Sequence, residues 1–76
     1  MSKEEAVKIL EKVYSDLKVS SIIEYEDKYI ANMVKKNGES IIGGTKGIVK
    51  DTGKVMEINP LRHKGLVKLL MEAEEV

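Results

Sequence analysis

The chain of 76 residues contains no cysteine, no tryptophan, no phenylalanine and a single proline. Without cysteine, a disulfide framework and a thiolate metal site are both excluded, and nothing suggests an oxidising compartment. No apolar run approaches the roughly 20 residues that cross a bilayer, and the N-terminal sequence MSKEEAVKIL places acids where a signal peptide would be apolar. We therefore expect a cytoplasmic protein without a membrane partner.

The chain is also short, and its charges cancel. A domain of this size buries only about 60% of its unfolded surface, so we expect one domain over residues 1–76 with no deep pocket and no cofactor. Thirteen basic and thirteen acidic side chains give zero formal charge, but residues 28–68 carry nine bases against three acids. This basic middle could contact an acidic protein or nucleic acid; alternatively, acidic helices pack beside a basic sheet and neutralise it.

An amphipathic helix is predicted over residues 2–17. Ser2 and Glu5 have the spacing of a capping box, in which a serine side chain satisfies an N–H group at the start of a helix. Apolar residues then recur at intervals of three and four, which is the period of a helix with one buried side. These residues are Ala6, Ile9, Leu10, Val13 and Leu17.

Strands are predicted after this helix. Residues 20–25 and 28–36 are rich in β-branched and aromatic residues and are separated by a two-residue turn. The Asn-Gly dipeptide at residues 37–38 is a strong hairpin signal, because both residues tolerate positive φ. It predicts the pairs Met33 with Ile42 and Val34 with Ile41. The glycines at residues 43–44 are expected to bend the returning strand before it resumes near Lys46.

A further hairpin is predicted around the sequence Asp-Thr-Gly at residues 51–53. These residues fit a type I turn closed by a glycine at positive φ, followed by a last strand over residues 55–58. The predicted cross-strand pairs are Lys50 with Lys54, Ile48 with Met56, and Lys46 with Ile58. We expect the side that carries Ile48, Met56 and Ile58 to be the one that the helices cover.

A final helix is expected to begin at Asn59 and Pro60, because asparagine caps helices and proline suits the first helical position. Its predicted inner stripe consists of Leu66, Leu69, Leu70 and Ala73. Gly65 weakens the helix by up to about 1 kcal/mol relative to alanine, so its first turn should be irregular. The predicted fold is α+β in two layers: a helix, an antiparallel meander of three or four strands and a C-terminal helix, with both helices on one face.

The sequence offers no constellation for catalysis or metal binding. His63 is the only histidine, and a catalytic triad or histidine metal site would need partners at a recognisable spacing. Residues 43–47 are rich in glycine but lead into a strand, whereas a P-loop leads into a helix. Glu24, Glu26 and Asp27 crowd one turn but lack the spacing of an EF-hand. We therefore expect no catalytic residue, no metal site and no enzymatic activity.

Partner binding is predicted on the open face of the sheet. Interface cores favour aromatic residues and methionine, and lysines are expected at hairpin tips and strand edges. The predicted contact residues are Tyr29, Asn32, Met33, Lys35, Lys36, Lys46, Lys50 and Lys54. The same lysines could bind phosphates, although Tyr29 alone makes a thin platform for stacking bases.

The end of the chain, from Gly43 to about Glu74, resembles the YrhB-type immunity-protein domain and includes the sequence GGTKGIVKDTGKVMEI at residues 43–58. That family combines a loop of small residues, a hairpin similar to VDKxTGxV and a closing helix, which correspond here to residues 43–44, 48–55 and 66–73. A second resemblance is to PepSY domains, which also place a helix before a meander that ends in a D-x-x-TGxV hairpin. Both resemblances imply binding or inhibition, and neither transfers a catalytic residue.

The sequence thus predicts a small non-enzymatic protein that docks on a larger protein and inhibits it. An immunity protein, an antitoxin or a phage-encoded counter-defence inhibitor would act in this way. The alternative is a small nucleic-acid-binding domain that uses the basic central sheet. Oligomeric state is left open, because an edge strand at residues 20–25 or 55–58 could pair with its copy in a homodimer.

Overall fold

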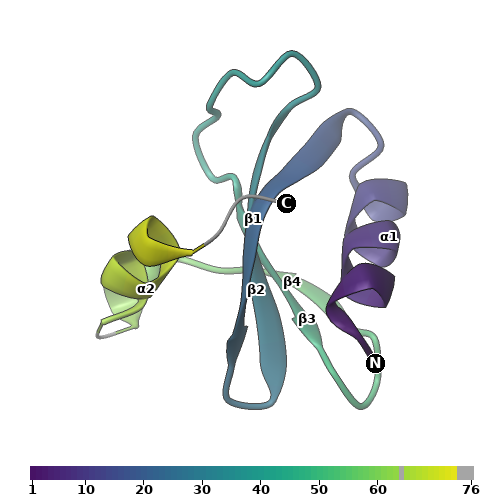
Figure 1. Ribbon diagram of the computed structural model, residues 1–76, viewed down its shortest axis with the longest axis vertical. Coiled ribbons are helices and arrows are strands. Elements are labelled where there is room, and N and C mark those ends of the chain that lie inside the picture. The colour runs from purple at the N-terminus through teal and green to yellow at the C-terminus, as the bar shows by residue number, and fades with distance from the viewer. Residues whose placement is uncertain (64, 74–76) are drawn as a thin grey trace.

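The computed structural model describes residues 1–63 and 65–73, which form one antiparallel sheet with two helices (Figure 1). The elements are α1 (Lys3–Val13), β1 (Leu17–Tyr25), β2 (Lys28–Lys35), β3 (Thr45–Val49), β4 (Val55–Glu57), a 3₁₀ turn (Pro60–Arg62) and α2 (Leu66–Glu72). The strands lie side by side in their sequence order, so the sheet is a meander. The predicted α+β class and the order helix, meander, helix are confirmed.

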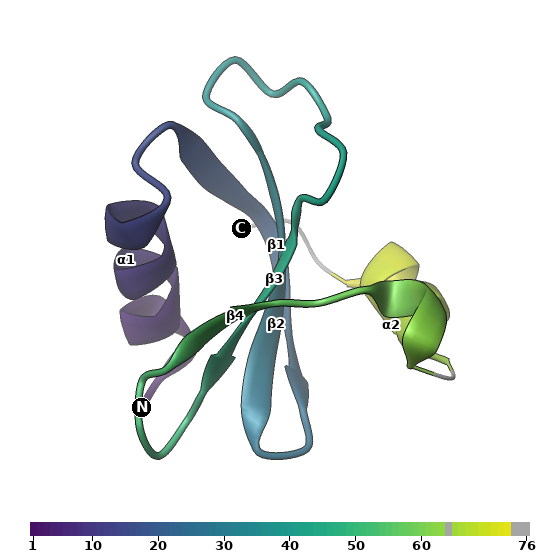
Figure 2. The ribbon, with the colours of Figure 1, turned by 180° about the vertical axis from the view of Figure 1, so that it is seen from behind.

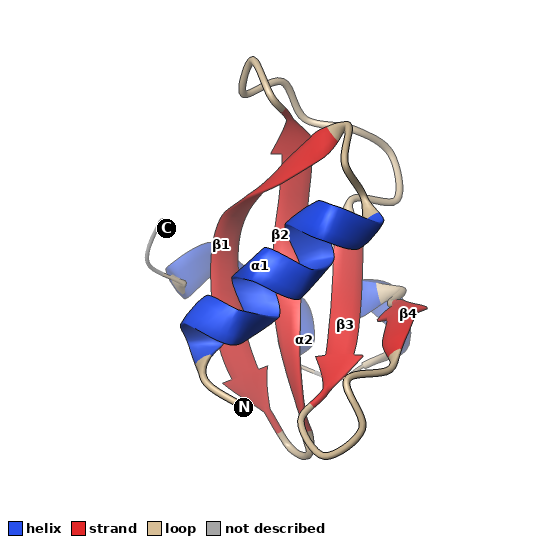
Figure 3. Ribbon diagram, turned by 90° about the vertical axis from the view of Figure 1, so that its right-hand side faces the viewer, coloured by secondary structure: helices blue, strands red, loops and turns tan. Residues whose placement is uncertain are grey.

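The two helices lie on opposite faces of the sheet, which corrects the prediction of two layers with both helices on one face (Figure 3). The core under α1 consists of Ala6, Leu10, Val19, Ile22, Tyr29, Ala31, Met33 and Ile48, and the core under α2 of Ile30, Ile58 and Leu66. The cause lies in β2, where successive side chains point to opposite faces. Because both faces of β2 carry large apolar side chains, each face needs a cover.

Helix α1 begins where the capping box predicts. The Ser2 hydroxyl accepts a hydrogen bond from the Glu5 N–H at 3.2 Å. The helix ends at Val13 and not at Leu17, because Leu17 already belongs to β1, where it pairs with Lys35. Leu17 still packs against the α1 core. Its apolar character fits either a helix or a strand, so the periodicity placed the end of the helix too late.

The hairpin between β3 and β4 is one residue out of the predicted register. The observed pairs are Ile48 with Val55, Gly47 with Met56 and Lys46 with Glu57. The connecting loop spans residues 50–53, because the Val49 N–H donates to the Lys54 carbonyl at 2.9 Å. A shift of one residue moves side chains to the other face of a sheet. Met56 and Ile58 therefore pack under α2 and not beside Ile48.

The Asn-Gly turn at residues 37–38 forms, but the chain after it does not return as a strand. The Lys35 N–H donates to the Glu39 carbonyl at 2.9 Å, and the next bond to β2 runs from the Met33 N–H to the Gly44 carbonyl at 2.7 Å. Between these two bonds the chain forms a loop that stands away from the sheet (Figure 2). The predicted pairs Met33 with Ile42 and Val34 with Ile41 are therefore wrong.

The C-terminal helical region is divided at Gly65. The Asn59 side chain accepts a hydrogen bond from the Leu61 N–H at 3.1 Å and caps a single 3₁₀ turn. Gly65 then adopts φ 81°, and α2 begins at Leu66, so the irregular start predicted from this glycine is observed. Leu66 is fully buried as predicted, whereas Leu69 is 44% exposed and does not belong to an inner stripe.

Candidate functional site

Two of the predicted contact residues, Tyr29 and Met33, lie in the core under α1. Met33 is fully buried, and Tyr29 is only 8% exposed. The Tyr29 hydroxyl donates to the Met1 carbonyl at 3.0 Å, and the Lys50 ammonium lies 5.1 Å from the centre of the Tyr29 ring. Helix α1 covers this face of the sheet. The structure places both side chains in the core, and their predicted contact role stays untested.

Lys46, a third predicted contact, is also buried. Its ammonium donates to Glu57 Oε1 at 2.7 Å and lies 4.8 Å from the centre of the Tyr14 ring. This hydrogen bond, together with the positive charge, lowers the pKa of the Glu57 carboxyl below its ordinary value. Lys46 thus joins β3, β4 and the end of α1, and its charge is not presented to solvent.

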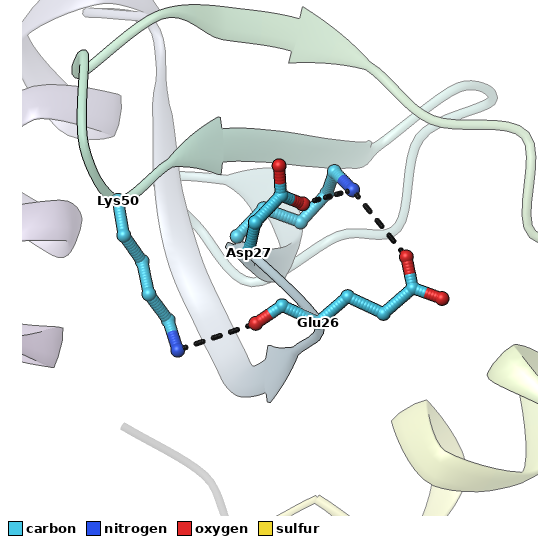
Figure 4. A network of polar contacts seen from close by, with 4 residues as sticks. Glu26, Asp27 and Lys50 are labelled. Atoms are coloured by element: carbon cyan, nitrogen blue, oxygen red, sulfur yellow. Dashed lines mark hydrogen bonds and ion pairs between the residues drawn. The ribbon is translucent and has the colours of Figure 1, made fainter.

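Lys28 and Lys50 pair with the acids around the turn between β1 and β2. Figure 4 shows Glu26, Asp27 and Lys50 at this turn. The Lys28 ammonium lies 2.8 Å from Asp27 Oδ1 and 4.0 Å from Glu26 Oε2. The Lys50 ammonium forms an ion pair with the Glu24 carboxylate and lies 3.4 Å from the Glu26 carbonyl oxygen. These hydrogen bonds lower the pKa values of Asp27 and Glu24. The acids of this turn already have cationic partners within the protein.

The remaining predicted contacts occupy different parts of the molecule. Lys35 and Lys36 are exposed beside the Asn-Gly turn, where the Lys35 ammonium lies 3.7 Å from Glu39 Oε2. Lys54 is exposed where the chain enters β4. Asn32 is half-buried on the face that α2 covers, and it lines a hollow there. The eight predicted residues therefore do not form one binding surface.

The loop between Glu39 and Gly44 supplies a surface that was not predicted. Ile42 in this loop is fully exposed. The loop returns to the sheet at Gly44, where an added Cβ atom would lie 2.4 Å from the carbonyl oxygen of Met33. A glycine is therefore required at this position, and the close backbone contact fixes where the loop ends.

A hollow of about 620 Å³ lies between this loop and the segment that leads into the 3₁₀ turn. Ile42 lines it, together with Leu61, which is 86% exposed. Among residues 1–63 and 65–73, the one charged residue that lines the hollow is Glu57, whose carboxylate accepts a hydrogen bond from Lys46. We call the four apolar residues at this hollow that are not part of the core the loop surface: Ile41, Ile42, Pro60 and Leu61.

Sequence reasoning missed the loop surface because Ile41 and Ile42 were assigned to a paired strand. The two adjacent isoleucines before the glycines at residues 43–44 could have indicated an exposed apolar surface. Adjacent residues of a strand point to opposite faces. In the predicted two-layer fold one of the two isoleucines would have faced solvent, which is unfavourable unless a partner covers it.

His63, the only histidine of the chain, packs against an aromatic ring. The His63 ring packs edge-on against the Tyr25 ring, with ring centres 6.1 Å apart. Within residues 1–63 and 65–73, no three side chains of His, Asp or Glu are grouped so that they could hold a metal ion. In the same part of the chain, no helix has the length and apolar character needed to cross a membrane.

Comparisons with models of protein families, with curated proteins and with solved structures found no match. The resemblances to YrhB-type and PepSY domains therefore stay predictions.

Proposed function

We propose that this protein is a non-enzymatic binding domain that docks on a larger protein through the loop surface and inhibits it, as an immunity protein or an antitoxin does. The observation that carries the proposal is the full exposure of Ile42 next to Leu61 at one hollow. Single exposed apolar residues are common on monomers, but apolar residues gathered in one patch mark interaction sites. The loop surface is such a patch.

The loop also suits docking because its ends are held before a partner arrives. Backbone hydrogen bonds from β2 close it at Glu39 and at Gly44. A further hydrogen bond, from the Glu39 N–H to the Asn37 side chain at 3.0 Å, holds the turn before it. A loop that is already ordered loses less conformational entropy on binding, so more of the interaction energy appears as affinity.

Ion pairs within the molecule reduce the support for the nucleic-acid alternative. Four lysines of the basic middle have carboxylate partners: Lys28, Lys35, Lys46 and Lys50. Affinity for nucleic acid comes chiefly from lysines and arginines that neutralise phosphates. Lysines that are already paired contribute less to that term, and none of the lysines that the structure describes lines the hollow at the loop surface.

The proposal is tested by capture with a matched pair of variants. Tagged wild type, Ile42→Ser and Val13→Ser are each used to capture partners from native lysate of the source cell. Val13 is an exposed apolar residue of α1, across the sheet from α2. We expect wild type and Val13→Ser to recover the same protein in a stoichiometric complex and Ile42→Ser to recover far less. The purified partner should lose its activity when wild type is added in equal amount.

Two results would overturn the proposal. One is recovery of nucleic acid without a protein, with an affinity that falls steeply as salt is raised. The other is a protein complex that Ile42→Ser leaves intact, because the interface would then lie elsewhere.

A further inference from the structure

Helix α2 carries apolar side chains beyond the side that faces the sheet. Five of its seven residues are large and apolar: Leu66, Val67, Leu69, Leu70 and Met71. Leu66 and Leu70 pack toward the sheet, whereas Val67 is 40%, Leu69 44% and Met71 81% exposed. A surface helix normally confines its apolar residues to the stripe that faces the core. The outer side of α2 is therefore expected to have a cover.

We propose that the cover is a second copy of the chain, with α2 packed antiparallel against α2 of the other copy about a two-fold axis. Val67 and Met71 are four residues apart, so they form a ridge along one side of the helix. In an antiparallel pair, Val67 of each copy meets Met71 of the other. This reciprocity is what a two-fold interface requires.

The surface beside this ridge can accept the side chain of a second copy. A hollow of about 280 Å³ is lined by Asn32, Pro60 and Leu70 together with the ridge residues Val67 and Met71. The Met71 side chain of the other copy would enter this hollow. Methionine is unbranched and flexible, and it fills irregular apolar spaces well.

Charge complementarity identifies the occupant as a copy and sets the direction of the pair. Lys68 and Glu72 each follow a ridge residue, so they lie along the same flank of α2. A two-fold axis across an antiparallel pair keeps that flank on the same side in both copies, which brings Lys68 opposite Glu72 twice. Neither residue has an ion-pair partner within the part of the chain that the structure describes. The chain also has zero formal charge, so no net repulsion opposes self-association.

The edge strands are poorer candidates for this contact, although the sequence pointed to them. The Glu11 carboxylate accepts a hydrogen bond from the Val19 N–H at 3.0 Å, which occupies a donor on the edge strand β1. The other edge strand, β4, has only three residues. Short or blocked edges resist pairing with another chain.

The test is the oligomeric state, measured by sedimentation equilibrium over a range of protein concentrations. Wild type should be in a reversible monomer–dimer equilibrium. Lys68→Glu and Glu72→Lys should each weaken the dimer by about tenfold, because each replaces two attractive pairs with two repulsive ones. The double variant Lys68→Glu/Glu72→Lys should dimerise nearly as well as wild type. Circular dichroism confirms that each variant is folded.

Apolar variants complete the test. Met71→Ser should weaken the dimer, whereas Ile42→Ser at the loop surface should leave it unchanged. The proposal is overturned if wild type is monomeric at every concentration that stays soluble. It is also overturned if neither Lys68→Glu nor Met71→Ser changes the dimer dissociation constant. Because Ile42 tests the loop surface and Met71 tests α2, failure here leaves the proposed docking function standing, and the reverse also holds.

Discussion

The ammonium of Lys46 lies 2.7 Å from Glu57 Oε1, although the Lys46 side chain is only 7% exposed and the Glu57 side chain is 79% exposed. The two partners of this ion pair therefore sit in different environments. The lysine has lost most of its contact with water, and Glu57 and the Tyr14 ring stand in its place. The glutamate remains hydrated and loses little if the lysine is removed.

This asymmetry predicts unequal effects when the pair is broken from either side. Glu57→Ala should destabilise the protein, because it leaves a buried ammonium without its carboxylate. Lys46→Met removes the buried charge and keeps a side chain of similar length, so its effect should be small or even stabilising. Urea unfolding of both variants measures the difference. A larger loss for Lys46→Met than for Glu57→Ala would contradict this account of the pair.

Gly44→Ala should destabilise the protein by about 2 kcal/mol, a typical cost of forcing extra atoms into a packed site. Gly44 is not among the glycines with positive φ, so a change to alanine would ordinarily stabilise it by about 0.4–1 kcal/mol. The backbone carbonyl oxygen of Met33 turns this expected stabilisation into a destabilisation, because it lies 2.4 Å from the added Cβ atom. Gly47→Ala is the control: its nearest contact, at 3.0 Å, is the side chain of Ile58, which can shift. Thermal or urea unfolding should show the smaller loss for Gly47→Ala.

Tyr29→Phe should cost about 1 kcal/mol of stability, because it removes a hydroxyl that donates to the Met1 carbonyl. The ring itself stays in place under α1. Partner capture should be unaffected, since Tyr29 is buried and does not belong to the loop surface. Unchanged stability together with lost capture would show instead that Tyr29 is a contact residue.

Stability should fall on the acid side of neutrality. The pKa values of Glu24 and Glu57 lie below the ordinary value of 4.5, and that of Asp27 lies below 3.8, in each case through a hydrogen bond from a lysine. The unfolded chain therefore binds protons before the folded protein does, and the stability from these pairs is lost as the pH falls through the folded values. Melting temperatures should be steady above about pH 5 and drop below it. Glu24→Gln/Glu57→Gln should make the drop shallower.

At alkaline pH, the stability that Lys28 contributes should fall as the pH rises. Its hydrogen bond to Asp27 raises the pKa of Lys28 above 10.5. The stability from this pair is fully present below 10.5 and is lost as the pH rises through the folded value. Lys28→Met should remove this part of the alkaline decline, measured by the same melting experiment.

Capping residues and turn residues in the sequence predicted the positions of most turns and helix starts. Ser2 caps α1 and Asn59 caps the 3₁₀ turn, because each supplies a side-chain oxygen to a free N–H group nearby. Gly38 and Gly53 adopt positive φ within the predicted turns. These features depend on a few adjacent residues, so a short stretch of sequence is enough to predict them.

The errors concern relations between distant residues. A loop of three residues and a loop of four can both end at Gly53, so the turn residues did not fix the register of β3 against β4. This register decides to which face of the sheet Met56 and Ile58 point. Ile41 and Ile42 have strand-like character, yet the closure at Gly44 takes them out of the sheet. The burial of Tyr29 was missed for the same reason, because its exposure depends on where α1 lies.

The sequence by itself determined the α+β class, the order of the elements, the turns and the caps, because hydrogen bonding and backbone preferences within a few residues control them. Only the tertiary structure decided which face each helix covers. That choice buries Met33 and Lys46 under α1 and leaves Met71 exposed on α2. The physical reason is that β2 is apolar on both faces, and only packing of the whole chain can assign a helix to each face.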